Sequence, residues 1–281
     1  MPLSKLSRQI KDTILRKYYS FRIQSPSKPY HLAFRHTPYK LLFILSHMRS
    51  GSSLLTHLLV DHAEITGYGE THLSYGSEAD FKPLLQKVYW AVRGLRMQHT
   101  YVLDKILHNQ RLQTPAILKT DQVKTIFLLR QPTATIASLL KLKPHWNEQD
   151  ALGYYVQRIK TLEAYAQEIA DPQHSFFLTY ETLIEQTPAA LLALQNFLEL
   201  KMPLSETYRL TRQTGMKGVG DSSDKIKAGQ IIRSQSDGTF ALAEENLRLA
   251  TLVFEQCQTT LSQVCQVTQP SPENTQNIAT G

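Results

Sequence analysis

A short polar loop lies between two apolar segments, Leu41 to Ser46 and Leu54 to Val60, and reads Arg49-Ser50-Gly51-Ser52-Ser53. This order predicts a strand, a tight loop and a helix. A glycine in such a loop lets backbone N–H groups close around an anion, and the start of the helix adds a partial positive charge. Arg49 supplies a cation beside the loop, so the pattern predicts a site for a phosphate or a similar anion.

The loop lacks two features of a nucleoside triphosphate site. The pattern G-x-x-x-x-G-K-[ST] would place glycine at position 46 and lysine at position 52, where this chain has Ser46 and Ser52. The lysine that reaches the β- and γ-phosphates is therefore missing, and no carboxylate for Mg²⁺ stands at a strand end. A phosphoryl-transfer kinase is thus the weaker alternative, and an anion other than a triphosphate is expected.

A second candidate anion site follows the apolar run Thr125 to Leu129, which the sequence predicts as a buried strand. Arg130 ends this run, Pro132 stands where the first turn of a helix tolerates proline, and Ser138 lies eight residues after the arginine. A guanidinium and a helix-borne hydroxyl at the carboxyl edge of a parallel sheet can hold a phosphate. Two such sites on one edge suit a nucleotide with phosphates on both ends of its ribose.

These two motifs resemble those of sulfotransferases that use 3′-phosphoadenosine 5′-phosphosulfate (PAPS), especially the carbohydrate, tyrosylprotein and bacterial branches. The resemblance covers Leu41 to Gln230. It implies that Arg49 and the loop residues up to Ser53 hold the 5′-phosphosulfate, and that Arg130 and Ser138 hold the 3′-phosphate. It also implies PAPS as the co-substrate, no metal, and in-line transfer of the sulfuryl group to an acceptor hydroxyl.

The glycine-flanked segment Gly67 to His72 resembles the one in which several of these enzymes place a catalytic carboxylate. The resemblance assigns Glu70 as the general base that takes the proton of the acceptor hydroxyl. His72 is the competing base, because other branches of the family use histidine.

Lys105 follows the apolar run Tyr101 to Leu103 and resembles the family's lysine that contacts the transferring sulfuryl group or the bridging oxygen. With Arg49 it is expected to stabilise the charge that develops on the leaving phosphate. Lys119 is a rival if Ile117 to Asp121 is a strand edge. It lies only eleven residues before the arginine of the second anion site, which leaves little room for a helical crossover.

Lys217 and Gly218 lie in a polar stretch without periodicity, residues 212–239, and long loops of this kind tend to be binding segments. The stretch resembles the glycine-rich loop that closes on the nucleotide 3′-phosphate in cytosolic sulfotransferases. It lacks one residue and a tryptophan of that pattern, and Met216 stands where arginine is usual. A solvated basic loop fits equally well. The lysines available to close the site are Lys217, Lys225 and Lys227.

Predicted strands and helices alternate along the rest of the chain. Further strands are expected at Ile65–Tyr68 and Ser175–Tyr180, and helices at Ala79–Arg96, Pro132–Leu140, 146–170, Pro188–Leu200 and Ala241–Val264. Such alternation predicts a parallel sheet between helical layers. With the resemblance, it gives an α/β, three-layer, P-loop-like fold with a central parallel β-sheet flanked by helices, at residues 41–267.

The composition is that of a soluble globular protein, with 42% hydrophobic and 20% charged residues among 281. The longest apolar run, Ala189 to Leu194, has six residues, whereas crossing a bilayer takes roughly 18. The N-terminus shows no secretory signal. Cys257 and Cys265 would lie about 12 Å apart on a helix, too far for a disulfide. A reducing, cytoplasmic location is expected.

Residues 1–40 form a basic arm with nine lysines and arginines against Asp12 alone, while the rest of the chain is nearly neutral. Leu6, Ile10 and Ile14 recur at helical spacing, and the preferred interpretation is a helix that docks them on the core. Weak contact with a membrane surface is the alternative. No zinc-ligand spacing or base-stacking motif supports a nucleic-acid partner. Residues 268–281 are expected to be a disordered tail.

The acceptor is expected to be a small-molecule, carbohydrate or lipid hydroxyl, bound by Ser74 to Thr100 and Lys143 to Tyr155. Aromatic residues in and beside these stretches are candidates for a pocket lining, although the core is expected for most of them. They are Tyr75, Trp90, Tyr101, Trp146 and Tyr154. A non-catalytic nucleotide-binding protein that docks through its basic arm is the alternative from another functional class.

Overall fold

The computed structural model describes residues 3–211, 214, 224–233 and 242–269. Its centre is a six-stranded sheet in the order β2-β3-β1-β4-β5-β6, in which every pair of neighbours is parallel. The strands are β1 (Lys40–Ser46), β2 (Ile65–Thr66), β3 (Tyr101–Ile106), β4 (Val123–Leu129), β5 (Ser175–Thr179) and β6 (Gln266–Val267). The predicted parallel sheet is therefore confirmed.

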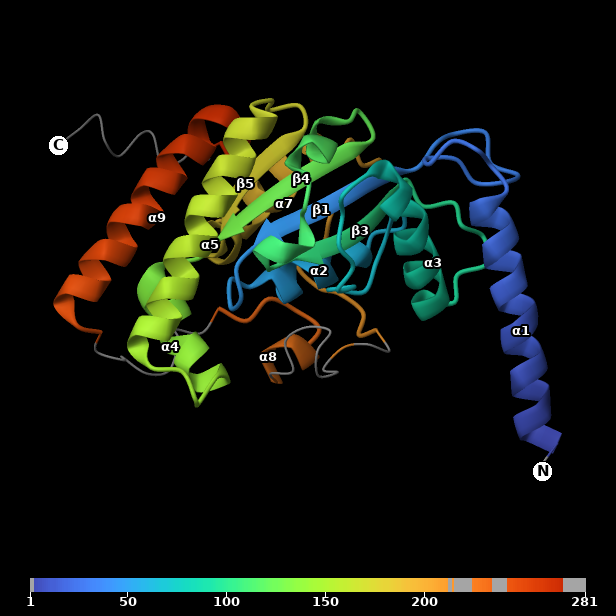
Figure 1. Ribbon diagram of the computed structural model, residues 1–281, viewed down its shortest axis with the longest axis horizontal. Coiled ribbons are helices and arrows are strands. Elements are labelled where there is room, and N and C mark those ends of the chain that lie inside the picture. The colour runs from blue at the N-terminus through green and yellow to red at the C-terminus, as the bar shows by residue number, and fades with distance from the viewer. Residues whose placement is uncertain (1–2, 212–213, 215–223, 234–241, 270–281) are drawn as a thin grey trace.

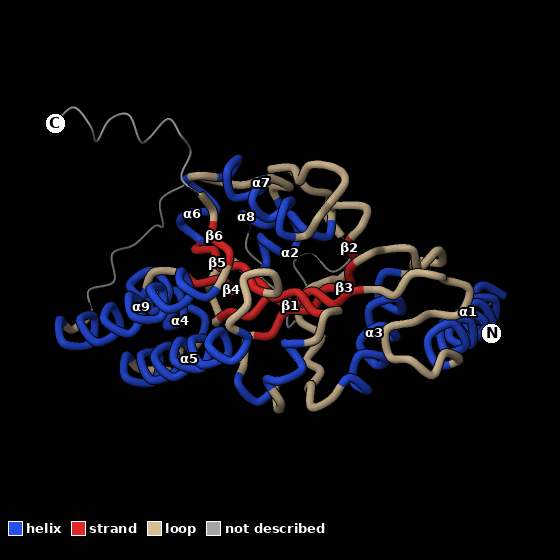
Figure 2. Tube along the Cα trace, turned by 90° about the horizontal axis from the view of Figure 1, so that it is seen from above, coloured by secondary structure: helices blue, strands red, loops and turns tan. Residues whose placement is uncertain are grey.

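Helices cover both faces of this sheet (Figures 1 and 2). One layer holds α1 (Leu3–Gln24), α3 (Phe81–Val92), α4 (Pro132–Leu142), α5 (Glu148–Ile169) and α9 (Glu244–Val264). The other holds α2 (Ser52–Val60), α6 (Tyr180–Glu185), α7 (Thr187–Phe197) and α8 (Asp224–Lys227). Successive residues of β1 alternate between the two cores, with Phe43 in the first and Ile44 in the second. The strand is apolar on both faces because both are covered.

The order of the strands creates a topological switch point between β1 and β4. The chain leaves β1 toward β2 on one side of the sheet and leaves β4 toward β5 on the other. Loops diverge at such a point, and ligands bind in the crevice that they leave at the carboxyl ends of the strands. The two predicted anion sites follow these two strands.

Several predicted elements differ from the structure. Strand β3 runs on to Ile106, so Lys105 lies within it, and β6 and the short α6 were not predicted. Lys119 is exposed at the end of a 3-10 turn, Pro115–Lys119, and its Nζ is 3.3 Å from Glu168 on α5. The interpretation of Lys119 as a strand-edge residue is therefore wrong. The remaining 3-10 turns are Glu78–Asp80 and Asn109–Arg111.

Helix α1 forms as predicted but docks through a different face. Tyr19 and Ile23 are buried against α3 and its surroundings, whereas Ile10 and Ile14 are exposed. The prediction that Ile10 and Ile14 pack on the core is wrong. The physical reason is that α1 carries apolar residues on two opposite sides, and spacing alone does not tell which side meets the core.

The predictions for the C-terminal part can be compared with the structure up to residue 269. Cys257 and Cys265 are buried free thiols, as expected from their separation. Most of the predicted tail, from residue 270 onward, lies outside the described residues. Within the described part of the chain, every helix is too short or too polar to cross a membrane.

Helix α5 holds the carboxyl edge of the sheet with two tyrosines. The Tyr154 hydroxyl accepts from the Met48 N–H at 2.9 Å and donates to the Leu107 carbonyl at 3.1 Å. The Tyr155 hydroxyl donates to the Arg130 carbonyl at 3.0 Å. The segments that follow β1, β3 and β4 are thus fastened to one helix.

Arg158, one turn further along α5, is the largest fully buried side chain described. It donates to the Ser46 carbonyl at 2.9 Å, the Ile106 carbonyl at 2.7 Å and Asn109 Oδ1 at 2.6 Å. Burial lowers its pKa to about 10, which leaves it charged at neutral pH. The buried charge is tolerated because these bonds satisfy acceptors at the ends of β1 and β3 and in the turn that follows β3.

We expect Arg158→Met to destabilise the protein by about 3 kcal/mol or more, because it leaves two buried carbonyls and a side-chain amide without a donor. Urea unfolding followed by circular dichroism measures the change. Arg248→Met, at an exposed position of α9, is the matched control and should leave stability within about 0.5 kcal/mol. Equal stabilities of the two variants would contradict this role of Arg158.

Candidate functional site

The loop after β1 has the geometry of an anion-binding turn. Arg49 and Gly51 both have left-handed backbone conformations, with φ of 65° and 87°, and α2 begins at Ser52. Left-handed residues within such a turn direct successive N–H groups to one side, and the helix start adds its dipole. The Ser46 hydroxyl donates to the Leu128 carbonyl at 2.6 Å, which ties the end of β1 to β4.

Gly51 is required at its position for two reasons. Its φ is one that residues with a Cβ rarely adopt, and a Cβ built there would lie 2.2 Å from Tyr180 Cδ2. The Tyr180 ring therefore lies directly against the loop. The Arg130 guanidinium carbon lies 4.5 Å from the centroid of the same ring, so Tyr180 lies between the two anion motifs.

The two predicted anion sites are in direct contact. Arg49 Nε donates to Ser138 Oγ at 2.8 Å, and Arg130 Nη1 donates to the Arg49 carbonyl at 3.1 Å. Arg130 Nε is buried and has no hydrogen-bond partner among the described residues. A buried guanidinium N–H without a partner is costly, and an oxyanion beside it would satisfy it.

His47 connects the loop after β1 with the backbone of Arg130, and so links the two predicted anion sites. Its Nε2 accepts from the Arg130 N–H at 3.1 Å, and its Nδ1 lies 2.9 Å from the Met48 carbonyl. Since Nε2 must accept and Nδ1 must donate, the neutral ring with a proton on Nδ1 is the form that fits. Burial lowers the pKa of His47 to about 3, which favours this neutral form.

Glu70 lies in a turn that β3 holds in place. Gly67 packs against β3 so closely that a Cβ would lie 2.8 Å from the Leu103 carbonyl. Asp104 of β3 accepts from the Thr71 N–H at 2.9 Å, the Thr71 hydroxyl at 2.7 Å and the Tyr75 hydroxyl at 2.5 Å. Burial raises the pKa of Asp104 to about 6, against the effect of these bonds. The backbone that follows Glu70 is thereby fixed.

Two imidazoles lie beside the Glu70 carboxylate. Glu70 Oε1 is 3.4 Å from His72 Nδ1 and 3.9 Å from His108 Nε2, and it has no hydrogen-bond partner among the described residues. Burial lowers the pKa of His108, and the nearby Glu70 charge opposes this. The His108 ring lies 6.3 Å from that of Tyr154. The Tyr154 hydroxyl accepts from the N–H of Met48, which directly precedes the loop Arg49 to Ser53, called the phosphate loop below. A carboxylate and two histidines therefore form a proton-accepting cluster close to that loop.

The Lys105 side chain lies on the face of β3 opposite to that of Asp104 and reaches the start of α2. Its Nζ donates to Ser53 Oγ at 3.2 Å, and the residue is 2% exposed. Its neighbour Asp104 serves the Glu70 turn because successive side chains of a strand point to opposite faces. One strand thus supports both the carboxylate turn and the cationic side of the phosphate loop.

Comparison with known proteins decides the family. The family model described as a sulfotransferase domain matches residues 40–241, well over half of the chain. This chain belongs to the sulfotransferase family. It is a PAPS-dependent enzyme that transfers a sulfuryl group to an acceptor hydroxyl.

Two solved structures are similar to this sulfotransferase. The sulfotransferase domain of the Synechococcus PCC 7002 olefin synthase is 18% identical over 78% of this chain and 96% of its own, with a TM-score of 0.53, which supports the common fold. The mouse sulfotransferase SULT7A1, solved with PAP, is 15% identical over 89% of this chain and 90% of its own, with a TM-score of 0.44. No curated protein sequence matches the chain.

The predicted residues of this sulfotransferase fall into two groups at the sheet edge. Arg49, Arg130 and Ser138 contact one another, and Lys105 contacts Ser53. Glu70 and His72 form the second group, and Tyr154 connects it to the first through His108 and Met48. Lys217 and Gly218 lie outside the described residues.

Sequence reasoning missed four residues of this site. Tyr180 was predicted only as the last residue of a strand, and no motif marked His47, Asp104 or His108, although Asp104 directly precedes Lys105 and His108 follows it by three residues. Among the described residues, no group of three His, Cys, Asp or Glu side chains is arranged to hold a metal ion.

We expect the stabilising effect of His47 to depend on pH. The folded state keeps the ring neutral down to about pH 3, whereas the unfolded chain takes up a proton below its ordinary pKa of 6.5. Its contribution is therefore complete above about pH 6.5 and falls by up to about 1.4 kcal/mol per pH unit as the solution is acidified. His47→Phe, which keeps a ring but no hydrogen bonds, removes this dependence.

Urea unfolding of the parent protein and of His47→Phe between pH 5 and pH 8 measures this pH dependence of the free energy of unfolding. The variant should be less stable by about 1–3 kcal/mol above pH 7, because the Met48 carbonyl and Arg130 N–H lose their partner, and the difference should shrink toward pH 5. Other buried histidines remain in both proteins and cancel in the comparison. A difference that stays constant with pH would show that His47 is not held neutral.

Proposed function

We propose that this sulfotransferase binds PAPS across the switch point between β1 and β4. The loop from Ser50 to Ser53 would cradle the 5′-phosphosulfate with its N–H groups, and Arg130 with Ser138 would hold the 3′-phosphate. The direct contact between Arg49 and Ser138 at 2.8 Å carries this proposal. It brings the two anion motifs, 89 residues apart in sequence, within the span of one nucleotide.

The unpartnered Nε of Arg130 supports the same assignment. A 3′-phosphate would supply the missing acceptor, and a bidentate guanidinium contact would also fix its orientation. Tyr180, which lies against Gly51 and Arg130, would offer an aromatic face beside the nucleotide. A nucleoside triphosphate has no 3′-phosphate, and Ser52 stands where a kinase would need lysine, so phosphoryl transfer is not favoured.

Glu70 is the proposed general base. It would take the proton of the acceptor hydroxyl as the acceptor oxygen forms its bond to sulfur. As the bond between sulfur and the 5′-phosphate oxygen breaks, the electron pair stays on that oxygen, where Arg49 and Lys105 would stabilise the charge. The buried position of Lys105 beside Ser53 strengthens its interaction with such a charge.

His72 remains the competing base, and His108 joins it as a candidate. Both lie beside Glu70 Oε1, at 3.4 Å and 3.9 Å. Glu70 is preferred because its turn is fixed through Thr71 and Asp104, whereas His72 is exposed. The imidazoles would then orient the carboxylate and receive its proton for release to solvent.

The acceptor is proposed to be an alcohol of a small molecule, carbohydrate or lipid. Of the aromatic candidates for its pocket, Tyr75 and Tyr101 belong to the core, as expected. Trp146 is half-buried and lies 5.8 Å from the Tyr154 ring. Tyr154 in turn lies 6.3 Å from the His108 ring beside Glu70, and Trp146 would form an apolar wall for the acceptor.

We expect Glu70→Gln to lower kcat by about 10²–10⁴-fold while the affinity for PAP (3′-phosphoadenosine 5′-phosphate) stays within about twofold, because only proton removal is lost. PAP release in the presence of PAPS and a panel of sugar, phenol and lipid alcohols measures the rate. Calorimetry measures the affinity.

Glu255→Gln, on the exposed side of α9, is the matched control and should behave as the parent. Full activity of Glu70→Gln with loss in His72→Asn or His108→Asn would transfer the role of base to that histidine. Binding of PAP by the parent without turnover of any acceptor would favour a non-catalytic binding protein.

A further inference from the structure

The rotation of helix α1 is fixed by specific contacts with the α3 region. Tyr19 and Ile23 are buried, and the Tyr19 ring lies 6.2 Å from that of Tyr89 on α3. Asp12 forms an ion pair with Arg93 at 3.0 Å. These residues share one side of the helix, so the opposite side faces away from the protein.

That opposite side is apolar and exposed. Ile10, Ile14 and Phe21 recur at spacings of four and seven residues, which places them in one stripe, and they are 52%, 63% and 52% exposed. Phe34, which is 81% exposed, extends the stripe through a ring contact with Phe21 at 5.7 Å. We call these four residues the outer stripe. Large apolar side chains grouped in this way mark an interaction surface.

The charges around the outer stripe are almost all positive. On the helical wheel Lys17 borders the stripe on one side and Lys11 lies toward the other, and both are exposed. The only acidic residue among residues 1–40 is Asp12, which Arg93 pairs on the other side. An apolar stripe bordered by cations on a helix too polar to span a bilayer is the pattern of a helix that lies on an anionic membrane surface.

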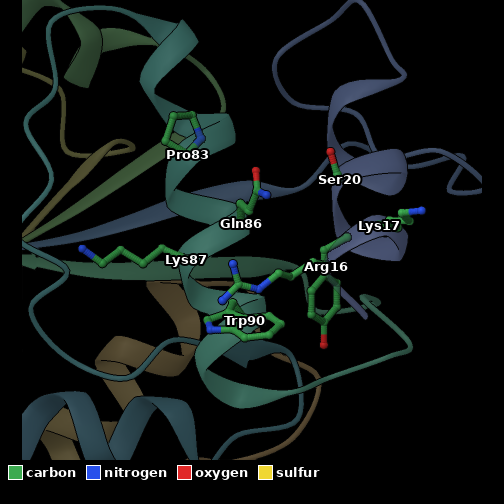
Figure 3. A pocket seen from close by; sticks show the side chains of 8 residues that line it. Arg16, Lys17, Ser20, Pro83, Gln86, Lys87 and Trp90 are labelled. Carbon is green, nitrogen blue, oxygen red and sulfur yellow. The ribbon is translucent and has the colours of Figure 1, made fainter. Parts of the chain in front are cut away.

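A basic groove of about 620 Å³ lies between α1 and α3, next to the outer stripe. Figure 3 shows Arg16 reaching from α1 over Trp90 of α3, while Lys17 points away from α3. The Arg16 guanidinium carbon lies 4.5 Å from the Trp90 ring centroid. Lys87 of α3 also lines the groove, but it extends away from α1 and its Nζ donates to the Thr71 carbonyl. No acidic residue lines the groove. Its size and charge suit the phosphate-bearing headgroup of one lipid.

We propose that the outer stripe of α1 binds the surface of a bilayer that contains anionic phospholipid, with one headgroup at Arg16 in the groove and further headgroups at Lys17 beside the stripe. The stripe enters the region between headgroups and acyl chains, and the lysines meet the phosphates. This inference does not depend on the proposed catalytic roles. Charge favours a membrane over a second copy of the chain, because pairing two copies through this face would bring two basic surfaces together.

Flotation with vesicles tests the proposal on the full-length protein. The parent should float with vesicles of phosphatidylcholine plus phosphatidylglycerol and not with phosphatidylcholine alone, and high salt should weaken binding. Ile14→Glu combined with Phe21→Glu should lower the partition coefficient by about tenfold or more, because charges replace apolar groups at the interface. Lys17→Glu should weaken binding to the anionic vesicles in the same direction.

Leu192→Glu combined with Leu252→Glu is the matched control, since it changes two equally exposed apolar residues on α7 and α9 and should leave binding unchanged. Thermal unfolding checks that all variants fold. Equal loss of binding in both double variants, or no flotation of the parent, would overturn the proposal. Light scattering that shows a dimer without vesicles, lost in the Ile14 and Phe21 variant, would overturn it in favour of a second copy.

Discussion

The candidate active site depends on how one helix satisfies the buried ends of three strands. Backbone groups at the carboxyl edge of a parallel sheet leave the sheet's own hydrogen-bond ladder, and when buried they need other partners. Helix α5 provides them through Arg158, Tyr154 and Tyr155. The segments after β1, β3 and β4 therefore keep fixed relative positions, and these segments carry the groups that we propose meet the donor and the acceptor.

The bonds that hold this edge in turn set its chemistry. His47, neutral and buried, fixes the loop after β1 to the end of β4, and Arg130 Nη1 donates to the Arg49 carbonyl in the same loop. A nucleotide with phosphates on both ends of its ribose would offer acceptors to both arginine side chains. Asp104 fixes the Glu70 turn to β3 through its hydrogen bonds with Thr71, just as His47 fixes the phosphate loop to the end of β4.

Local patterns in the sequence predicted the parallel sheet, the loop from Arg49 to Ser53 and the motif of Arg130 and Ser138, because each of these is a contiguous strand, turn and helix start. The same patterns did not predict partners distant in sequence. His47 and Arg130 are 83 residues apart, and Glu70 meets His108 only because β2 and β3 are neighbours in the sheet. The docking face of α1 was missed because both of its sides are apolar, and the contacts with α3 decide between them.

Calorimetric titration with PAP, with AMP and ATP as comparison ligands, tests whether two phosphate sites meet at the switch point. We expect binding that requires the 3′-phosphate, with AMP much weaker, and a loss of about 100-fold in Arg130→Ala but not in the exposed Arg248→Ala, because removing a bidentate charged contact costs about 3 kcal/mol. Absence of PAP binding, or preference for ATP with Mg²⁺, would contradict it.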